Sequence, residues 1–358
     1  MSNSFSTPTT PSSLGYSMPA EWARHHATWL SWPHNLETWP TDLEKVREIW
    51  IQMICALSPH ELVYLLVNDA STEQEVTARL KAANAALANV RPLRIPTVDA
   101  WMRDYGPTFV RRNSHDAPLA FNDWIFNGWG GKYQAYEEDE RVAREIATLL
   151  KVPVFNHKII LEGGSIEVNG AGTCLTTEQC LLNRNRNPQM RQQEIEQVLK
   201  NSLGVSQVIW LGDGIAGDDT DGHIDDIARF IDPRTAVCII EANSKDANYR
   251  CLQENYERLR NAKDQSGGEL ELVTLPCPSP VYFENARLPA SYANFYIANE
   301  VVLVPVFDDR NDKEALGILQ ELFPERKVIG LRCNEVVAGL GAIHCVTQQE
   351  PAVSLPRP

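Results

Sequence analysis

Helical and β-rich segments alternate along almost the whole chain, and this alternation limits the fold more than any other feature. Amphipathic stretches predict helices near 42–57, 73–88, 138–150, 191–202, 246–261 and 312–322. Runs rich in branched apolar residues predict strands at 27–32, 62–67, 108–111, 158–160, 208–211, 237–241, 301–307 and 328–331. The pattern predicts an α/β fold of four or five β–α units of roughly 60–70 residues each. Alternation alone leaves open an ordinary α/β sheet and a radial repeat.

Two of the expected helices begin at sequences typical of capping boxes. In each, a hydroxyl residue stands three positions before an acid or amide: Thr41 before Glu44, and Ser71 before Gln74. The sequence therefore predicts Thr41 and Ser71 as the capping residues.

The chain termini and the apolar runs bear on its compartment. Residues 1–17 are rich in Ser, Thr and Pro, lack Lys and Arg, and are predicted to be a disordered tail rather than a secretory signal. No linker-like stretch interrupts residues 20–350, so 18–358 is expected to form a single domain. The longest apolar runs, such as 301–307, fall far below the ~18 residues that a membrane span needs. We therefore expect a soluble, cytoplasmic protein that does not contact membranes.

The charge balance separates classes of ligand. Lys and Arg total 33 and Asp and Glu total 47, which gives a formal net charge of −14. Nucleic-acid phosphates require a basic surface, so a nucleic-acid partner is not expected. An acidic molecule attracts cations, so a small cationic ligand is favoured.

The eight cysteines show no spacing typical of a structural zinc site. Without an export signal, disulfides are not expected either. Cys55 lies in a helical apolar pattern and Cys238 in an apolar strand, so both are expected to be buried.

Five glycine-containing segments carry polar or ionisable residues at expected strand ends. The residues singled out are Asp104, Glu162, His223, Asn294 and Cys345, which are 58, 61, 71 and 51 positions apart. This is about one polar group per β–α unit. A radial arrangement of the units would bring these groups to a common centre.

Cys345 follows the glycine-rich turn 339–341 and is a candidate nucleophile, with a structural core cysteine as the alternative. His344 is its neighbour. In an extended segment adjacent side chains point to opposite faces, so His344 is expected to be structural rather than the base for Cys345.

His223 and Asp225 are two positions apart, so on a strand they share one face. They could bind a metal, or act as a base with a cation anchor, or belong to a surface acidic loop. A calcium loop is excluded because Gly217 and Ala228 stand where an EF-hand requires carboxylates. Asp104 and Glu162 could equally be turn residues.

With these residues in view, the chain resembles the agmatine deiminase family of the guanidine-modifying (pentein) superfamily, which is related to the bacterial-type peptidylarginine deiminases. The resemblance runs from Met18 to Gln349. Its motifs lie at 18–22, 27–33, 127–133, 161–165, 183–188, 290–299 and 343–349. It implies that residues 18–358 form a single pentein catalytic domain. The implied fold is a five-bladed α/β propeller of ββαβ units around a pseudo-fivefold axis.

Matched position by position, the resemblance implies a role for each core residue. Cys345 would be the nucleophile, His223 the general acid/base, and Glu162 its carboxylate partner. Asp104 and Asp225 would hold the guanidinium through charge-assisted hydrogen bonds. The implied reaction is hydrolysis of agmatine to N-carbamoylputrescine and ammonia through a covalent thiouronium, a step toward putrescine and the polyamines. It needs neither metal nor organic cofactor.

The substrate tail is less defined. Trp101 could hold the substrate stem, and Asn294 matches a family segment. Asp219 stands where the family usually has a Glu expected to hold the distal ammonium, and it is one methylene shorter. Tyr105 replaces the usual Thr.

Three other functions stay open. An arginine or peptidylarginine deiminase would use the same chemistry but needs a donor for the substrate carboxylate or carbonyl, for which Arg103 and Arg287 are candidates. Amidino transfer would require exclusion of water. A non-catalytic guanidine- or cation-binding protein would need the aspartates but not the thiol. The family also allows a homo-oligomer.

Overall fold

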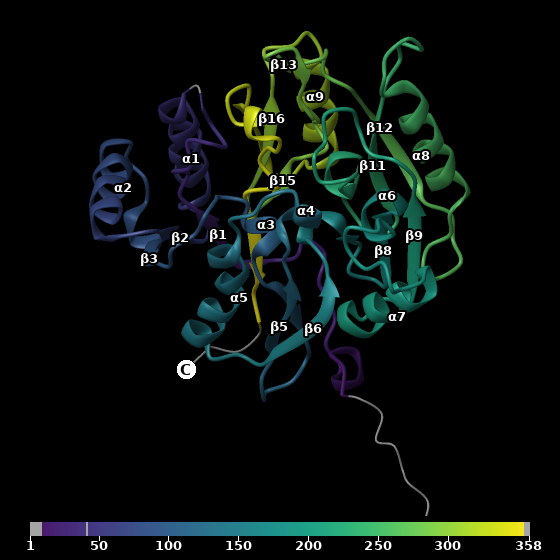
Figure 1. Ribbon diagram of the computed structural model, residues 1–358, viewed down its shortest axis with the longest axis horizontal. Coiled ribbons are helices and arrows are strands. Elements are labelled where there is room, and N and C mark those ends of the chain that lie inside the picture. The colour runs from purple at the N-terminus through teal and green to yellow at the C-terminus, as the bar shows by residue number, and fades with distance from the viewer. Residues whose placement is uncertain (1–8, 41, 354–358) are drawn as a thin grey trace, which may run out of the picture.

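The computed structural model describes residues 9–40 and 42–353 of the chain. Helices alternate with short strands, as the sequence predicts, and the fold is mixed α/β. Among the described residues the strands form several small mixed sheets. In Figure 1, α1 (Leu43–Leu57) and α2 (Ala70–Ala82) lie at one side of the molecule, α8 (Tyr249–Asn261) lies at the other, and the strands lie between them.

Four of the sheets share one strand pattern. In each, the first two strands are antiparallel and the third runs parallel to the second. The four sheets are β4 (Thr108–Arg111), β5 (Leu119–Ile125) and β6 (Val154–Ile160); β7 (Glu167–Val168), β8 (Thr173–Thr177) and β9 (Gln207–Leu211); β10 (Ala228–Phe230), β11 (Thr235–Ile240) and β12 (Glu271–Pro276); and β15 (Tyr296–Ile297), β16 (Val301–Val306) and β17 (Lys327–Arg332).

A parallel step needs a crossover, and a helix supplies it in each sheet. These helices are α5 (Glu137–Leu150), α7 (Gln192–Leu203), α8 and α9 (Asp312–Leu322). Each of the four sheets therefore has ββαβ connectivity.

The two ends of the chain build the remaining larger sheet. Its strand order is β18 (Gln348–Pro351), β1 (His25–Ser31), β2 (Leu62–Val67) and β3 (Val90–Arg94). β18 is antiparallel to β1, whereas β1, β2 and β3 run parallel and are joined through α1 and α2. The last strand thus completes the first sheet, and it places the turn that precedes β18 beside the N-terminal part of the chain.

Several short elements connect these units. They are η1 (Ser12–Leu14), η2 (Leu87–Asn89), α3 (Met102–Tyr105), α4 (Gly128–Gly131), η3 (Gly163–Ser165), α6 (Glu178–Leu181), η4 (Ile224–Asp226), β13 (Tyr282–Phe283), β14 (Ala286–Arg287) and η5 (Val337–Gly339). α3 and α4 lie near the middle of the view in Figure 1.

The core follows from helical periodicity. The buried residues of α1 recur every three or four positions, so they form one apolar face: Val46, Ile49, Trp50, Met53, Ile54 and Leu57. This face belongs to an apolar cluster that contains buried residues from Trp29 to Val346.

The helix starts differ from the predicted capping boxes. α2 begins at Ala70, and the side chain of Asp69 accepts a hydrogen bond from the Thr72 amide at 2.7 Å. Ser71 therefore lies inside the helix, and its prediction as the cap is wrong, because an aspartate two positions earlier supplies the acceptor. Asp42 caps α1, and Thr41 lies outside the described residues.

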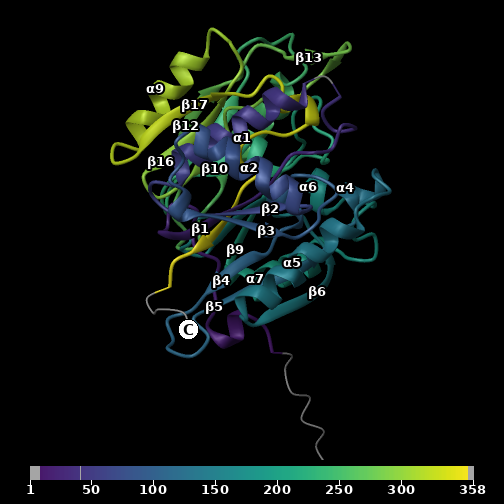
Figure 2. The same ribbon diagram turned by 90° about the vertical axis from the view of Figure 1, so that its left-hand side faces the viewer.

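The predicted disordered tail is wrong for residues 9–17. Tyr16 is buried and packs edge-on against Phe155 with ring centroids 5.7 Å apart. Ser17 and Arg111 exchange two backbone hydrogen bonds of 2.9 Å. Figure 2 shows this segment running beside β4 and β5. Residues 1–8 lie outside the described part of the chain.

All eight cysteines fall within the described ranges and are free thiols. Cys238 is buried as predicted, but Cys55 is partly exposed because it lies beside the end of α2, with its sulfur 3.6 Å from the Ala83 carbonyl.

No helix in the described ranges is long and apolar enough to cross a membrane.

Candidate active site

Cys345 lies in the turn between η5 and β18, with 5% of its surface exposed. The side-chain amide of Asn294 donates a hydrogen bond to its sulfur at 3.1 Å, and Oδ2 of Asp225 lies 3.8 Å away. The side-chain Oδ1 of Asn294 accepts a hydrogen bond from the backbone amide of His344 at 2.9 Å. The side chain of Asn294 therefore links the sulfur to the turn that carries it.

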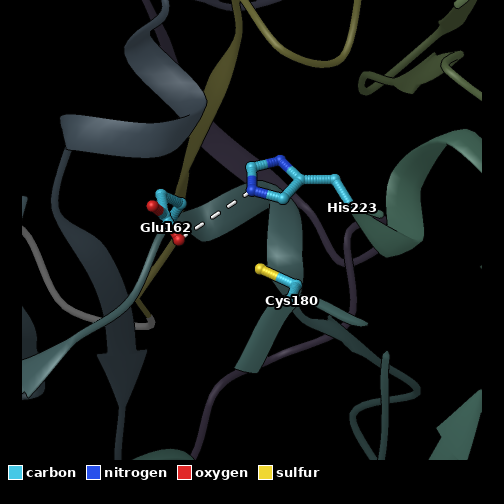
Figure 3. A group of neighbouring side chains, drawn as sticks. All are labelled: Glu162, Cys180 and His223. Atoms are coloured by element: carbon cyan, nitrogen blue, oxygen red, sulfur yellow. Dashed lines mark ion pairs between the residues drawn. The ribbon is translucent and has the colours of Figure 1, made fainter. Parts of the chain in front are cut away.

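A second group surrounds the imidazole of His223. Nδ1 lies 3.7 Å from Oδ1 of Asp104, and Nε2 lies 3.9 Å from Oε2 of Glu162 (Figure 3). All three side chains are buried. Within the described part of the chain, neither ring nitrogen has a hydrogen-bond partner. The ring thus lies between two carboxylates.

Gly164 brings the two groups together. A Cβ at this position would lie 2.5 Å from His223 Nδ1, 2.8 Å from Asp104 Oδ1 and 3.1 Å from Asp225 Oδ2. The Gly164 amide donates to Asp104 Oδ1 at 3.0 Å. These three side chains therefore crowd around one point, which a side chain at 164 would fill.

The buried carboxylates set the charge state of the free thiol and of Asp104. Burial raises the pKa of Cys345 well above its ordinary value, and Asp225, Asp226 and Asp104 raise it further. Burial also raises the pKa of Asp104 to about 6, with smaller contributions in the same direction from Asp225 and Glu162, although His223 and Trp129 act to lower it. Without a bound cation, these effects favour the protonated thiol of Cys345.

His223 and Glu162 are held in the opposite, charged states. Burial opposes protonation of His223, but Asp104, Cys180 and Glu162 outweigh it and raise its pKa well above the ordinary value. Burial opposes ionisation of Glu162, yet contacts with His223 and Arg186 lower its pKa. The pair is an imidazolium beside a carboxylate.

A cavity of about 360 Å³ leads to Cys345 and Asp104. Its wall includes Trp101 and Asp219, the two residues expected to contact a substrate tail. Its other aromatic and acidic lining residues are Trp129, Tyr133, Tyr136, Glu37, Asp99 and Asp139. None of the described lining residues is Lys or Arg, so the cavity suits a cation.

Asp219 already has partners in this wall. Its Oδ2 accepts from the Tyr133 hydroxyl at 2.7 Å, and its Oδ1 lies 3.5 Å from Lys132 Nζ. The lysine also pairs with Asp221 at 3.0 Å. A ligand ammonium that reached Asp219 would therefore compete with Lys132.

Sequence reasoning missed residues that support the site from behind. Arg186 donates from Nε to Oε1 of Glu162 at 2.9 Å, and Trp129 donates from Nε1 to Oδ2 of Asp104 at 2.9 Å. Both lie in segments that carried the family resemblance, 183–188 and 127–133, which was the only signal available.

Both ring nitrogens of His344 lie beside carboxylates. Its Nδ1 lies 2.7 Å from Asp225 Oδ2 and its Nε2 lies 2.8 Å from Glu21 Oε2. Glu21 also accepts hydrogen bonds from Arg103 and Arg229. His344 therefore fixes the orientation of Asp225, whose Oδ2 also lies 3.8 Å from the sulfur of Cys345. His344 and Cys345 lie in a turn, so the extended segment expected from the sequence is wrong.

One group of side chains in the described residues has the donor set of a metal site. Single ligand atoms of Glu162, Cys180 and His223 all lie within 4.8 Å of one another.

Comparison with known proteins identifies the family. Residues 17–351 match the protein family described as Porphyromonas-type peptidyl-arginine deiminase. The chain belongs to this family. An agmatine deiminase from Medicago truncatula is 37% identical to this chain, over 96% of this chain and 98% of its own length.

Solved structures agree with this assignment. The agmatine deiminase of Enterococcus faecalis superimposes with a TM-score of 0.89 at 34% identity, covering 97% of this chain and 98% of that one. A cysteine-to-serine variant of the agmatine deiminase of C. jejuni, solved with substrate bound, gives 0.84 at 33% identity and covers 94% and 96%.

Proposed function

We propose that this chain is an agmatine deiminase that hydrolyses agmatine to N-carbamoylputrescine and ammonia. The observation that supports this proposal is an acidic cavity whose lining, among the described residues, includes no Lys or Arg, and which ends at a cysteine beside buried aspartates. Agmatine is a dication, with a guanidinium at one end and an ammonium at the other. The relatives described above are agmatine deiminases.

Neither arginine candidate suits an arginine substrate. Arg103 is buried and donates to Gln349 and Glu21, whereas Arg287 pairs with Asp246 at 2.7 Å. Neither residue lines the cavity. A substrate carboxylate would therefore enter an acidic cavity without a cationic partner, which disfavours arginine relative to agmatine.

Binding prepares the nucleophile. The guanidinium lies between Asp104 and Asp225, which accept its N–H groups. This cation offsets the carboxylates that raise the pKa of Cys345, so the thiol releases its proton to solvent. Asn294 donates to the resulting thiolate. Trp101 lies along the alkyl chain, and Asp219 contributes to binding the distal ammonium.

The thiolate then attacks the guanidinium carbon and forms a neutral tetrahedral adduct. The His223 imidazolium gives its proton to one amino group, the C–N bond breaks, ammonia leaves, and a thiouronium cation remains on Cys345. Neutral His223, oriented by Glu162, removes a proton from water as the water attacks this carbon. The adduct then collapses: the C–S bond breaks, the hydroxyl proton passes to the departing sulfur, and Cys345 returns as a thiol as the neutral ureido product leaves.

We extend the proposal to the architecture. The four ββαβ sheets and the fifth sheet that β18 completes support a five-bladed α/β propeller with pseudo-fivefold symmetry. The apolar cluster from Trp29 to Val346 supports a single catalytic domain over residues 18–358.

The test compares agmatine, arginine and a peptide with C-terminal arginine, following ammonia and ureido product. We expect turnover of agmatine, and a loss of about 10⁴-fold or more in Cys345→Ser, with agmatine binding retained in calorimetry. Cys277→Ser is the matched control, because Cys277 is 6% exposed and lies outside the cavity wall. Preference for an arginine substrate would overturn the substrate assignment, and unchanged turnover in Cys345→Ser would overturn the covalent mechanism.

A further inference from the structure

Three donor atoms of different chemistry converge behind the substrate cavity. Glu162 precedes η3, Cys180 lies in α6, and His223 precedes η4. All three side chains are buried. In Figure 3 the sulfur of Cys180 points toward the gap between the carboxylate and the imidazole. A carboxylate oxygen, a thiol sulfur and an imidazole nitrogen therefore share one small volume, with all separations within 4.8 Å.

Two of these groups have unused bonding capacity. Oε2 of Glu162 and both ring nitrogens of His223 have no hydrogen-bond partner among the described residues. Nε2 and Oε2 are 3.9 Å apart, which is too long for a hydrogen bond. A cation about 2.0–2.3 Å from each ligand atom spans such a gap after a small inward movement. Buried polar atoms without partners at this spacing point to a ligand between them.

We infer that Glu162, Cys180 and His223 form an inhibitory binding site for a thiophilic divalent cation of the zinc class. Nitrogen, sulfur and carboxylate oxygen are the ligands that Zn²⁺ prefers, whereas Mg²⁺ and Ca²⁺ prefer oxygen alone. Arg186 holds Oε1 of Glu162 at 2.9 Å and leaves Oε2 free for the cation. On binding, the Cys180 thiol and the His223 imidazolium each release one proton to solvent, and no oxidation state changes.

The acidic cavity gives such a cation a route to the site. Asp104 lines the cavity and also lies 3.7 Å from His223 Nδ1. Glu37 and Asp99 in the same wall raise the local concentration of cations. The path that draws in a cationic substrate therefore also draws in a divalent metal.

Binding would stop the reaction because it takes the proton-transfer group. A cation on Nε2 of His223 takes the place of the proton there, so the ring can no longer form the imidazolium that protonates the departing ammonia. This consequence rests on the proposed function, whereas metal binding itself does not. The site is also distinct from the nucleophile, since the sulfur of Cys345 contacts Asn294 and Asp225 instead.

The binding test uses Co²⁺ as a spectroscopic probe of metal-free protein. Thiolate coordination gives a near-ultraviolet charge-transfer band. We expect this band in the wild type and in Cys345→Ser, and we expect it to disappear in Cys180→Ala. Cys174→Ala is the matched control, because Cys174 is equally buried in the adjacent strand β8 but lies outside the group. Cys180→Ser serves as a second variant should the alanine variant fail to fold.

The inhibition test measures agmatine turnover against Zn²⁺, with each variant compared with its own metal-free rate. We expect Zn²⁺ to inhibit the wild type and Cys174→Ala equally, and Cys180→Ala to need about tenfold more Zn²⁺ or higher for half-inhibition. A cobalt band that survives in Cys180→Ala but vanishes in Cys345→Ser would overturn the inference, as would the absence of any band. If agmatine is not turned over, the proposed function fails, but the cobalt band still decides whether the metal site exists.

Discussion

At the scale of single residues, the site depends on Gly164, because a residue with a side chain would occupy space that the site uses. His223, Asp104 and Asp225 surround the position where a Cβ of residue 164 would lie. The backbone of Gly164 does not adopt a positive φ, so alanine is tolerated by the main chain there. Glycine at position 164 is therefore needed to leave room for the neighbouring side chains, not to allow a special backbone conformation.

We predict that Gly164→Ala folds but loses catalysis. The added methyl would push His223 or the two aspartates away from the guanidinium position, and a displacement of about 1 Å can lower a rate by about 100-fold. The measurement is kcat/KM for agmatine, with circular dichroism to verify folding.

Gly317→Ala is the control for this variant. Gly317 lies in α9, and a Cβ there would meet no atom within 4 Å. Alanine in a helix interior is about 1 kcal/mol more favourable than glycine, so this variant should be slightly more stable and fully active. Equal kcat/KM in both variants would show that the space beside Gly164 is not needed.

The sequence could predict those site residues whose own side chains do the chemistry, because each lies in a polar segment that contains glycine. The structure brings these five side chains together: Cys345, His223, Glu162, Asp104 and Asp225. Arg186 and Trp129 could not be found by spacing, because their contribution is a hydrogen bond to a carboxylate that is distant in sequence. The Lys132 pairing that occupies Asp219 is of the same kind.

At the scale of elements, the turn Gly128–Gly131 shapes one wall of the site. Trp129 and the three glycines around it all have positive φ, and Asn127 accepts from the Gly130 amide at 2.8 Å. This left-handed path directs Trp129 toward Asp104. It also brings Gly130 against Asn185 and Arg186.

We predict that Gly130→Ala and Gly131→Ala differ in activity although their backbone strain is similar. Their φ values are 86° and 78°, and a left-handed alanine costs about 1–2 kcal/mol in each. Only the Cβ at 130 would meet Arg186, with Nη1 at 2.6 Å, whereas the Cβ at 131 meets nothing within 4 Å. Gly130→Ala should therefore also lower kcat about tenfold by moving Arg186 away from Glu162.

Thermal unfolding and kcat, measured for both variants, separate the two effects. We expect a loss of melting temperature in both variants, larger in Gly130→Ala because its Cβ would also meet the side chains of Asn185 and Arg186, and a loss of kcat in Gly130→Ala alone. A matching loss of kcat in Gly131→Ala would assign the effect to the turn conformation rather than to Arg186.

Elements with a strong local pattern could be predicted from the sequence. The helix at 312–322 and the strands at 62–67 and 108–111 have the expected bounds. The sequence did not predict strands β3, β5, β7, β8, β10, β12, β13, β14, β15 and β18. In β5, Asn122 and Asp123 interrupt the apolar run, yet Asn122 is buried and its Oδ1 lies 2.7 Å from Nε2 of His157. The partner that makes a polar strand residue tolerable lies far away in sequence, so local polarity misleads.

At the scale of the whole molecule, the pairing of the first and last strands and the excess of acidic residues both shape the candidate site. β18 pairs with β1 only when the two ends of the chain meet, and this pairing fixes the turn that carries Cys345. Local periodicity could not predict that contact. The net charge of −14 could be read directly, and in the structure part of it lines the substrate cavity.

Acidic groups in this cavity link ligand binding to pH. Burial raises the pKa of Asp104 and of Asp99 to about 6 each, well above the ordinary value for aspartate. A raised pKa in the folded state means that these groups contribute stability below their unfolded pKa of about 4, and that this contribution is lost as the pH rises through about 6. Burial favours the protonated form of these two aspartates, whereas a bound cation favours their ionised form.

We therefore predict that agmatine binds Cys345→Ser more tightly as the pH rises from 5 to 7. Below pH 6, binding must expel a proton from Asp104, so affinity should fall by about tenfold per pH unit. Calorimetry in two buffers of different ionisation enthalpy measures both the affinity and the protons released. The ureido product, which lacks the guanidinium charge, should show a weaker dependence. An affinity for agmatine that stays constant from pH 5 to 7 would mean that Asp104 is already ionised in the free protein, and that the cation is not what stabilises its charge.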